Sequence, residues 1–211
     1  MALSTLEFWD AFYAQKGDCA SNEWYYGEAT VLEVLDELLP AAAAAPADVL
    51  HVGCGTSLVG EALSARGHRV VNVDYSTEAI SRMRSRFPER RYEALDCRRM
   101  GDALGEAAFD VLLDKGTVDS MTAARATREA HGAALAREFA RVLRPGGRAF
   151  VFSSYGPDEE KDMMTLLRAG GADLSCRVLE HAPFEYPDQS VTYLYTLQKH
   201  GAAAAAAAAA A

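Results

Sequence analysis

Short apolar runs rich in β-branched residues alternate with longer helical segments along most of this chain, and this alternation restricts the fold more than any other feature. The runs expected to form strands are residues 49–52, 69–73, 92–95, 109–113 and 149–153, and helices are expected at residues 57–66, 76–86, 127–143 and 159–169. Strands that alternate with helices form a mostly parallel sheet with helices on both faces. Two final runs, 175–180 and 191–198, have no helix between them, so we expect them to pair antiparallel. The prediction is an α/β fold with seven strands.

The remaining parts of the chain flank this alternating region. Apolar residues recur at helical spacing over residues 5–39, with a polar break at 16–22, and residues 40–46 are interpreted as a linker. The last ten residues, 202–211, are alanine alone, and we assign them no function. The expected organisation is an N-terminal helical segment at 1–47, one α/β domain at 48–200 and an alanine tail at 201–211.

Charge and cysteine content argue against several classes of function. The chain has 21 basic and 30 acidic side chains, and its formal net charge of −9 repels the phosphates of a nucleic acid. No segment approaches the ~20 apolar residues needed to span a bilayer, and the first ten residues have no signal-peptide pattern. The four cysteines form no Cys-x-x-Cys pair, which argues against a zinc site or a disulfide framework. We therefore expect a cytoplasmic protein with no metal, membrane or nucleic-acid partner.

The strongest local signal is a glycine-rich turn, Gly-Cys-Gly-Thr-Ser at 53–57, between the first expected strand and the next helix. Ligands of open α/β sheets bind outside the carboxyl ends of the strands, and glycines there allow close approach to the backbone. A dinucleotide-binding turn has a third glycine three residues after the second, where this chain has Leu58. Leucine disfavours a pyrophosphate at this position and is compatible with a ligand that lacks one.

Acidic residues end the next two expected strands. Asp74 lies 19 residues after Gly55, where a carboxylate can accept hydrogen bonds from both ribose hydroxyls of a nucleoside. The alternative is that Asp74 only caps the following helix. Tyr75 is placed to cover an adenine, and Asp96, followed by Cys97, is placed to accept a hydrogen bond from the adenine amino group. Three successive strand ends thus predict a nucleoside site.

The fourth expected strand ends in a charged segment, Leu-Asp-Lys-Gly-Thr-Val-Asp at 113–119. The carboxyl end of a central strand lies on the ligand-binding side of such a sheet. Lys115 is either a surface residue or part of the site, and the adjacent Gly116, which indicates a constrained turn, favours the site.

Taken together, these motifs resemble those of the class I, seven-stranded, Rossmann-like S-adenosylmethionine-dependent methyltransferases. The resemblance covers about residues 6–198, including Val-Leu-Arg-Pro-Gly-Gly at 142–147. The Asp-Lys-Gly-Thr-x-Asp signature at 114–119 is narrower and is similar to that of the lysine methyltransferases of elongation factor 1-alpha and of citrate synthase. The elements Phe-Trp-Asp-x-x-Tyr at 8–13 and Glu-Trp-Tyr at 23–25 resemble the same subgroup. His51 departs from the pattern, which has an aliphatic residue there, and we expect it to pack within its strand.

The resemblance implies S-adenosylmethionine as the cofactor and a role for each matching residue. Three aromatic residues of the 1–47 segment would close over the cofactor, whose cationic sulfonium is attracted by aromatic faces. Residues at the first three strand ends would hold its methionine, ribose and adenine parts, and Lys115 would face it from the fourth. The implied cofactor-binding residues are Trp9, Tyr13, Trp24, Gly53, Gly55, Asp74, Tyr75, Asp96, Cys97 and Lys115.

The function implied by the resemblance is methyl transfer to a protein lysine. A nucleophile of the substrate attacks the methyl carbon in line with the departing sulfur, so the protein mainly aligns the two groups and excludes water. Asp114 and Asp119 are candidates for positioning a lysine ammonium, and no catalytic base is assigned. The alternatives are a small-molecule methyltransferase and a non-catalytic binding protein of the same fold. A nicotinamide-dependent oxidoreductase ranks below both, because Leu58 disfavours its cofactor.

Overall fold

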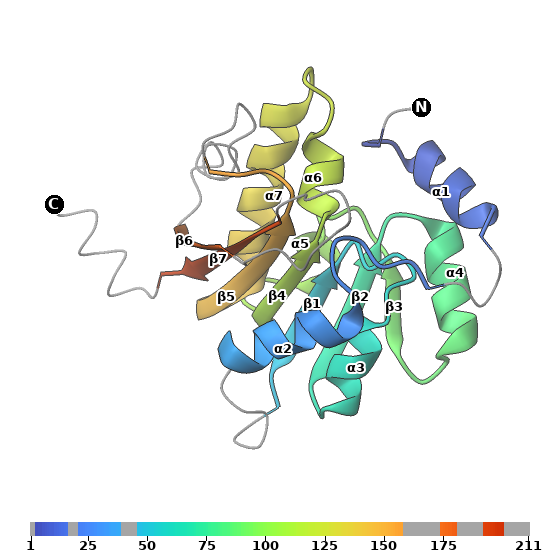
Figure 1. Ribbon diagram of the computed structural model, residues 1–211, viewed down its shortest axis with the longest axis horizontal. Helices are drawn as coiled ribbons and strands as arrows, with labels where there is room; N and C mark the ends of the chain where they lie inside the picture. Colours follow the sequence, from blue (N-terminus) through green and yellow to red (C-terminus); the bar gives the residue numbers. More distant parts are fainter. Residues whose placement is uncertain (1–2, 17–20, 39–45, 158–173, 181–191, 201–211) are drawn as a thin grey trace, which may run out of the picture.

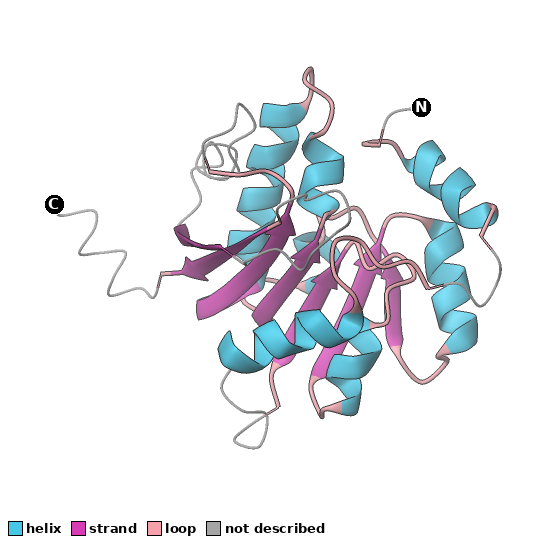
Figure 2. Ribbon diagram, in the orientation of Figure 1, coloured by secondary structure: helices cyan, strands magenta, loops and turns pink. Residues whose placement is uncertain are grey.

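The computed structural model describes residues 3–16, 21–38, 46–157, 174–180 and 192–200, in which one twisted sheet lies between two layers of helices (Figures 1 and 2). The strand order is β3-β2-β1-β4-β5-β7-β6. Strands β1 to β5 are parallel, whereas β7 pairs antiparallel with both β5 and β6. The strands are β1 (Asp48–Val52), β2 (Arg69–Asp74), β3 (Arg91–Ala94), β4 (Phe109–Lys115), β5 (Leu143–Ser153), β6 (Leu174–Glu180) and β7 (Tyr193–Lys199).

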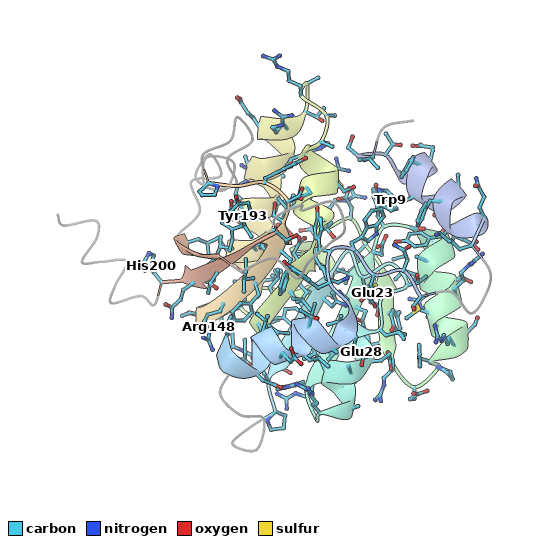
Figure 3. All side chains as sticks on the ribbon, in the orientation of Figure 1. Trp9, Glu23, Glu28, Arg148, Tyr193 and His200 are labelled. Atoms are coloured by element: carbon cyan, nitrogen blue, oxygen red, sulfur yellow. The ribbon has the colours of Figure 1, made fainter. Side chains whose placement is uncertain are left out.

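Helices cover both faces of this sheet because its central strands are apolar on both sides. Leu50 and Leu112 face a core shared with α6 and α7, whereas Val49 and Leu113 face a second core shared with α2 and α3. The helices are α1 (Leu6–Ala14), α2 (Glu28–Leu38), α3 (Val59–Ala65), α4 (Thr77–Arg86), α5 (Gly101–Leu104), α6 (Thr117–Thr122) and α7 (Arg128–Val142). Figure 3 shows how densely side chains fill the space on either side of the strands.

The predicted mostly parallel sheet, with helices on both faces and an antiparallel C-terminal strand pair, is confirmed. The expected cap of α4 is also present, since the Ser76 side chain accepts a hydrogen bond from the backbone N–H of Ala79 at 3.2 Å. Three expectations, the helix at 159–169, most of the 40–46 linker and the alanine tail, fall outside the described residues.

Two features differ from the sequence-based expectation. The strand expected to begin at Ala149 begins at Leu143, because Leu143 already pairs with Phe109 and the Pro-Gly-Gly segment forms an irregularity inside β5. The short helices α5 and α6 were not predicted, since four and six residues are too few for helical periodicity to show.

The order of the strands determines where a ligand can bind. Strands β1, β2 and β3 follow one another toward one edge of the sheet, while β4 lies on the other side of β1, so the direction in which strands are added reverses between β1 and β4. Crevices outside the carboxyl ends of the strands at such a reversal are the ligand sites of open α/β sheets. A ligand site is therefore expected at the loops that follow β1 and β4.

His51 lies within β1, as expected, and is almost completely buried. Its Nδ1 atom is 3.2 Å from Oδ1 of Asn72 on the neighbouring strand β2. Burial, together with the nearby charge of Lys115, lowers the pKa of His51 to about 4. The imidazole is therefore neutral at neutral pH and acts there as a buried polar member of the sheet.

Replacement of this histidine by valine is expected to change the pH dependence of stability. The unfolded chain takes up a proton near the ordinary histidine pKa of 6.5, whereas the folded protein resists it down to about 4, so acidification through this window favours unfolding. Urea unfolding of wild type and His51→Val across this range should show a smaller acid-side loss of unfolding free energy in the variant. Parallel profiles for the two proteins would contradict this assignment.

Candidate functional site

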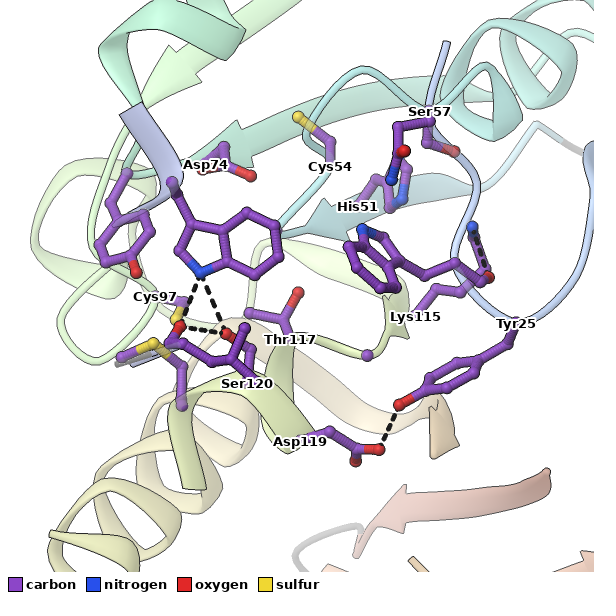
Figure 4. Close-up of a pocket in the computed structure, with 18 of the residues that line it drawn as sticks. Tyr25, His51, Cys54, Ser57, Asp74, Cys97, Lys115, Thr117, Asp119 and Ser120 are labelled. Atoms are coloured by element: carbon purple, nitrogen blue, oxygen red, sulfur yellow. Dashed lines mark hydrogen bonds between the residues drawn. The ribbon is translucent and has the colours of Figure 1, made fainter. Parts of the chain in front are cut away.

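A cavity opens at the carboxyl ends of β1, β2 and β4, beneath α1 and the 21–27 segment, which we call the strap (Figure 4). Nine of the twelve site residues predicted from the sequence line it, namely Trp9, Tyr13, Trp24, Gly53, Asp74, Tyr75, Cys97, Lys115 and Asp119. Gly55, Asp96 and Asp114 do not line it, although each lies next to a residue that does. The cavity thus brings together elements from the first 25 residues and from the carboxyl ends of five strands, β1 to β5.

The end of the cavity formed by β1 and β2, hereafter the β2 end, contains a buried carboxylate. Asp74 accepts hydrogen bonds from the backbone N–H groups of Gly55 and Ser76, each at 2.8 Å. Burial raises the pKa of Asp74 to about 6. An ionised carboxylate offers about four acceptor positions, so roughly two remain for a ligand.

A second polar group at the β2 end has no protein partner. The hydroxyl of Tyr75 is buried and makes no hydrogen bond within the described part of the chain. Buried polar atoms are nearly always paired in native proteins, so an unpaired one in a cavity wall indicates a position for a polar ligand atom. Asp74 and Tyr75 together suit a ligand with hydroxyl groups and a planar ring, such as a nucleoside.

Glycines allow the turn after β1 to fit tightly against two other elements. Gly53 has a φ of +60°, and a Cβ atom on it would lie 1.8 Å from Oγ1 of Thr117 in α6. Gly55 has a φ of +49°, and a Cβ atom there would lie 2.1 Å from the Tyr13 hydroxyl. Both positions combine a left-handed backbone with a close neighbour, so both require glycine.

Helix α1 covers the cavity and is attached on two sides. The Trp9 indole N–H donates to Ser120 Oγ of α6 at 3.1 Å and to the carbonyl oxygen of Leu3 at 2.7 Å. Asp10 accepts a 2.6 Å hydrogen bond from Ser76 Oγ at the start of α4. Trp9 also packs edge-to-face on Trp24 of the strap, with ring centroids 5.8 Å apart. The result is an aromatic roof over the carboxyl ends of the strands.

Glu23 joins the strap to the sheet, a role that the sequence analysis missed. One carboxylate oxygen accepts from Ser57 Oγ at 2.8 Å and from Lys115 Nζ at 2.6 Å, and the other accepts from the backbone N–H of Leu58 at 2.8 Å. Lys115 also donates to the carbonyl oxygen of Trp24 at 2.9 Å. Its side chain is 3% exposed, and burial lowers its pKa although Glu23 acts in the opposite direction.

The other end of the cavity, formed by β4, α6 and the residues after β5, is hereafter the β4 end. There the carboxylate of Asp119 accepts hydrogen bonds from the Tyr25 hydroxyl and from Ser153 Oγ, each at 2.5 Å. It also accepts from the backbone N–H and the hydroxyl of Ser154, at 2.8 and 2.9 Å. Figure 4 shows Tyr25 and Asp119 pointing toward each other, far across the cavity from Asp74. Tyr25 belongs to the Glu-Trp-Tyr motif at 23–25 but was given no role there, and Ser154 carried no signal in the sequence.

Two of the predicted acidic residues point elsewhere. Asp96 is engaged by Arg98, whose guanidinium contacts both carboxylate oxygens at 2.6 to 3.2 Å. Asp114 is fully buried beneath α6, where it accepts from the backbone N–H of Val118 at 3.2 Å. Burial raises the pKa of Asp114 to about 8. Asp114 therefore supports the first turn of α6, and Asp119 is the acid that reaches the cavity.

The described residues contain no group of three His, Cys, Asp or Glu side chains arranged to hold a metal ion. Among the helices in those ranges, none is long and apolar enough to cross a membrane.

Comparisons with known proteins find relatives over most of the chain. Residues 50–151 match a methyltransferase domain family. The eEF1A lysine and N-terminal methyltransferase of Danio rerio is 36% identical over 154 residues, which cover 69% of this chain but only 20% of that protein. The mitochondrial citrate synthase-lysine N-methyltransferase of Pongo abelii is 31% identical over 212 residues, which cover 90% of this chain and 84% of that protein.

A solved structure shares the fold. The TehB-like S-adenosylmethionine-dependent methyltransferase of Corynebacterium glutamicum superposes with a TM-score of 0.61 at 24% identity, and the match covers 92% of this chain and 95% of that one.

The glycine turn yields a stability prediction. Gly53→Ala places a methyl group against Thr117 and forces a non-glycine residue into a left-handed conformation, so we expect it to lower the unfolding free energy by ~2–4 kcal/mol. Gly67→Ala is the matched control, because Gly67 has a φ of +93° but nothing within 4 Å of an added Cβ. Its cost should be limited to the backbone effect, about 1 kcal/mol. Equal losses in urea denaturation would show that the contact with Thr117 has no effect.

Proposed function

This chain belongs to the class I S-adenosylmethionine-dependent methyltransferases, in the family that includes the lysine methyltransferases of eEF1A and of citrate synthase, and we propose that it methylates a protein lysine. The observation that carries the proposal is the single cavity with two chemically distinct ends. The β2 end has the carboxylate and unpaired hydroxyl that suit a nucleoside, and the β4 end has a carboxylate surrounded by hydroxyl groups.

The residues present fit S-adenosylmethionine. Asp74 would accept hydrogen bonds from the ribose hydroxyls, and Tyr75 would meet the adenosyl part with its unpaired hydroxyl. Cys97 supplies part of the wall for the adenine, and Gly53 lies where the methionine part would pass. Trp9 and Trp24 of the roof would face the sulfonium, which aromatic rings attract. Gly55 would act indirectly, through Asp74, and Asp96 through its position next to Cys97, while Lys115 and Tyr13 would hold the roof in place.

The chain's own residues supply alignment and exclusion of water in this proposal. When bound, the cofactor supplies a methyl group already activated by the positive charge on sulfur. The roof of α1 and the strap shields the reacting groups from water, and Asp119 favours a cationic acceptor at the β4 end. Positioning of this kind can account for a large part of a rate enhancement in a two-substrate reaction.

We further propose that the substrate is a protein and that the chain acts in the cytoplasm. Two relatives act, by their names, on lysines of eEF1A and of citrate synthase, and a net charge of −9 suits a basic protein segment. The chain spans about a fifth of the zebrafish relative, so substrate and partners are proposed for this chain rather than transferred to it. The citrate synthase relative is mitochondrial by name, and cell fractionation distinguishes that compartment from the cytoplasm we propose.

A small-molecule methyltransferase is the second candidate, and the aromatic roof favours it, because a covered cavity suits a ligand that can be enclosed. The nature of the labelled product separates the two functions.

The cofactor site predicts a pH-dependent affinity. Calorimetric titration with S-adenosylhomocysteine should give a dissociation constant on the order of micromolar at neutral pH, and Asp74→Ala should abolish binding. Because the pKa of Asp74 is about 6, acidification through that value protonates the acceptor carboxylate and should weaken binding.

Asp74→Asn should bind S-adenosylhomocysteine weakly, and its affinity should depend less on pH than that of wild type. Asp102→Asn, on the exposed surface of α5, is the control that should bind like wild type. Tight binding by Asp74→Ala would exclude this site.

The activity itself is tested by incubating the protein with radiolabelled S-adenosylmethionine and a proteome extract, with purified eEF1A and citrate synthase in parallel. Methyl-lysine recovered after acid hydrolysis of labelled protein is the expected result. Label confined to small molecules would support the second candidate instead. No labelled product despite S-adenosylhomocysteine binding would contradict an independent enzymatic activity.

A further inference from the structure

The carboxylate of Asp119 at the β4 end already accepts hydrogen bonds from four donors of the protein. One oxygen accepts from Ser153 Oγ, and the other accepts from the Tyr25 hydroxyl and from the N–H and hydroxyl of Ser154. Each carboxylate oxygen has about two acceptor positions, so Oδ2, with three donors, has none left, and Oδ1 is held in a buried hydrogen bond with Ser153. An incoming substrate group therefore meets the surrounding hydroxyl groups before it meets the carboxylate itself.

The hydroxyl group of Tyr25 donates its proton in a hydrogen bond to this carboxylate. Its oxygen lies 2.5 Å from Asp119 Oδ2 and 3.3 Å from Ser154 Oγ, and the shorter contact assigns the single proton to Asp119. Burial and the charge of Asp119 both raise the pKa of Tyr25, so the phenol stays protonated. With its proton donated inward, the Tyr25 oxygen presents its lone pairs to the cavity, which its side chain lines.

Tyr25 is held in this position although its backbone conformation is unfavourable. Tyr25 has a φ of +63°, a conformation that non-glycine residues rarely adopt. Its ring lies against Gly116, where an added Cβ would be 3.0 Å from the ring atom Cε2. The preceding residues hold the strap in place, because Trp24 accepts from Lys115 and Glu23 pairs with it. Strain retained in a cavity wall is a common sign of a functional position.

The charges at the β4 end favour a cation. Among the described residues that line this end, Lys115 and Asp119 carry charge, and Glu23 compensates Lys115 at 2.6 Å. The carboxylate of Asp119 is left as the uncompensated charge, and Tyr25 and Tyr155 add aromatic surface beside it. A protonated amine satisfies both features, through its charge and its N–H donors.

We propose that Tyr25 is the acceptor-binding residue of this site, whose oxygen takes a hydrogen bond from the substrate amine while Asp119 polarises the phenol from behind. The inference rests on the proposed function and adds the residue that positions the lysine nitrogen. The ammonium first releases one proton to water, and its freed lone pair then forms the nitrogen–carbon bond as the carbon–sulfur bond breaks and its electron pair remains on sulfur. An N–H group held by Tyr25 fixes the direction of that lone pair.

The test compares four proteins in the extract assay, namely wild type, Tyr25→Phe, Asp119→Asn and the double variant. Titration with S-adenosylhomocysteine should give the same affinity for Tyr25→Phe as for wild type, which shows that the fold and the β2 end are intact. The extract concentration that gives half-maximal methyl-lysine formation should rise roughly tenfold in Tyr25→Phe. Because both residues act through one hydrogen bond, the double variant should resemble Asp119→Asn alone.

Tyr92→Phe is the matched control, since the Tyr92 hydroxyl also donates to a carboxylate, Glu61 at 2.8 Å, but lies outside the cavity. Its half-maximal extract concentration should equal that of wild type. An unchanged value in Tyr25→Phe, with wild type forming methyl-lysine, would overturn the role of Tyr25 and leave the proposed function intact. Additive losses in the double variant would overturn the coupling through Asp119. Absence of methyl-lysine with wild type would instead reject the lysine substrate, and with it this inference.

Discussion

The ion pair between Glu23 and Lys115 connects the N-terminal segment to the sheet, and the rest of the site depends on it. The lysine side chain is 3% exposed at the end of β4, so its charge would be strongly unfavourable without a partner. The same carboxylate accepts from Ser57 and from the N–H of Leu58 in the turn after β1. One side chain of the strap therefore joins the two central strands, β1 and β4, at the point where the strand order reverses. Trp24 and Tyr25, the next two residues, are placed over the cavity as a consequence.

Much of the fold could be predicted from the sequence because its signals are local. A buried parallel strand such as β1 (Asp48–Val52) is a short run that is apolar apart from Asp48 and His51, and Ser76 begins α4 with a cap that needs only the next three residues. The extent of β5 could not be predicted, since Leu143 pairs with Phe109 across an irregularity that looks like a turn in sequence. Tertiary pairing outweighed the local turn signal there.

The site was predictable to a lesser degree. The ligand-facing position of the residues at the β2 end could be predicted, because ligands of open α/β sheets bind at carboxyl strand ends. This rule applies to Asp74 without knowledge of its neighbours. Asp114 and Asp119 could not be distinguished in this way, because the difference between them arises from α6. This helix starts at Thr117, so Asp114 lies beneath its first turn while Asp119, within it, faces the cavity. The role of Glu23, which belongs to the Glu-Trp-Tyr motif, could not be predicted because its partners lie 34 to 92 residues away along the chain.

The aromatic roof has a consequence for how this protein can be observed. The chain has two tryptophans, and both of them, Trp9 and Trp24, line the cavity with ring centroids 5.8 Å apart. All indole emission of the molecule thus originates at one place, with Trp9 bonded to Ser120 and Trp24 partly exposed to solvent. The intrinsic tryptophan fluorescence therefore reports on changes in the aromatic roof, and it can be measured in the unlabelled, unmodified chain.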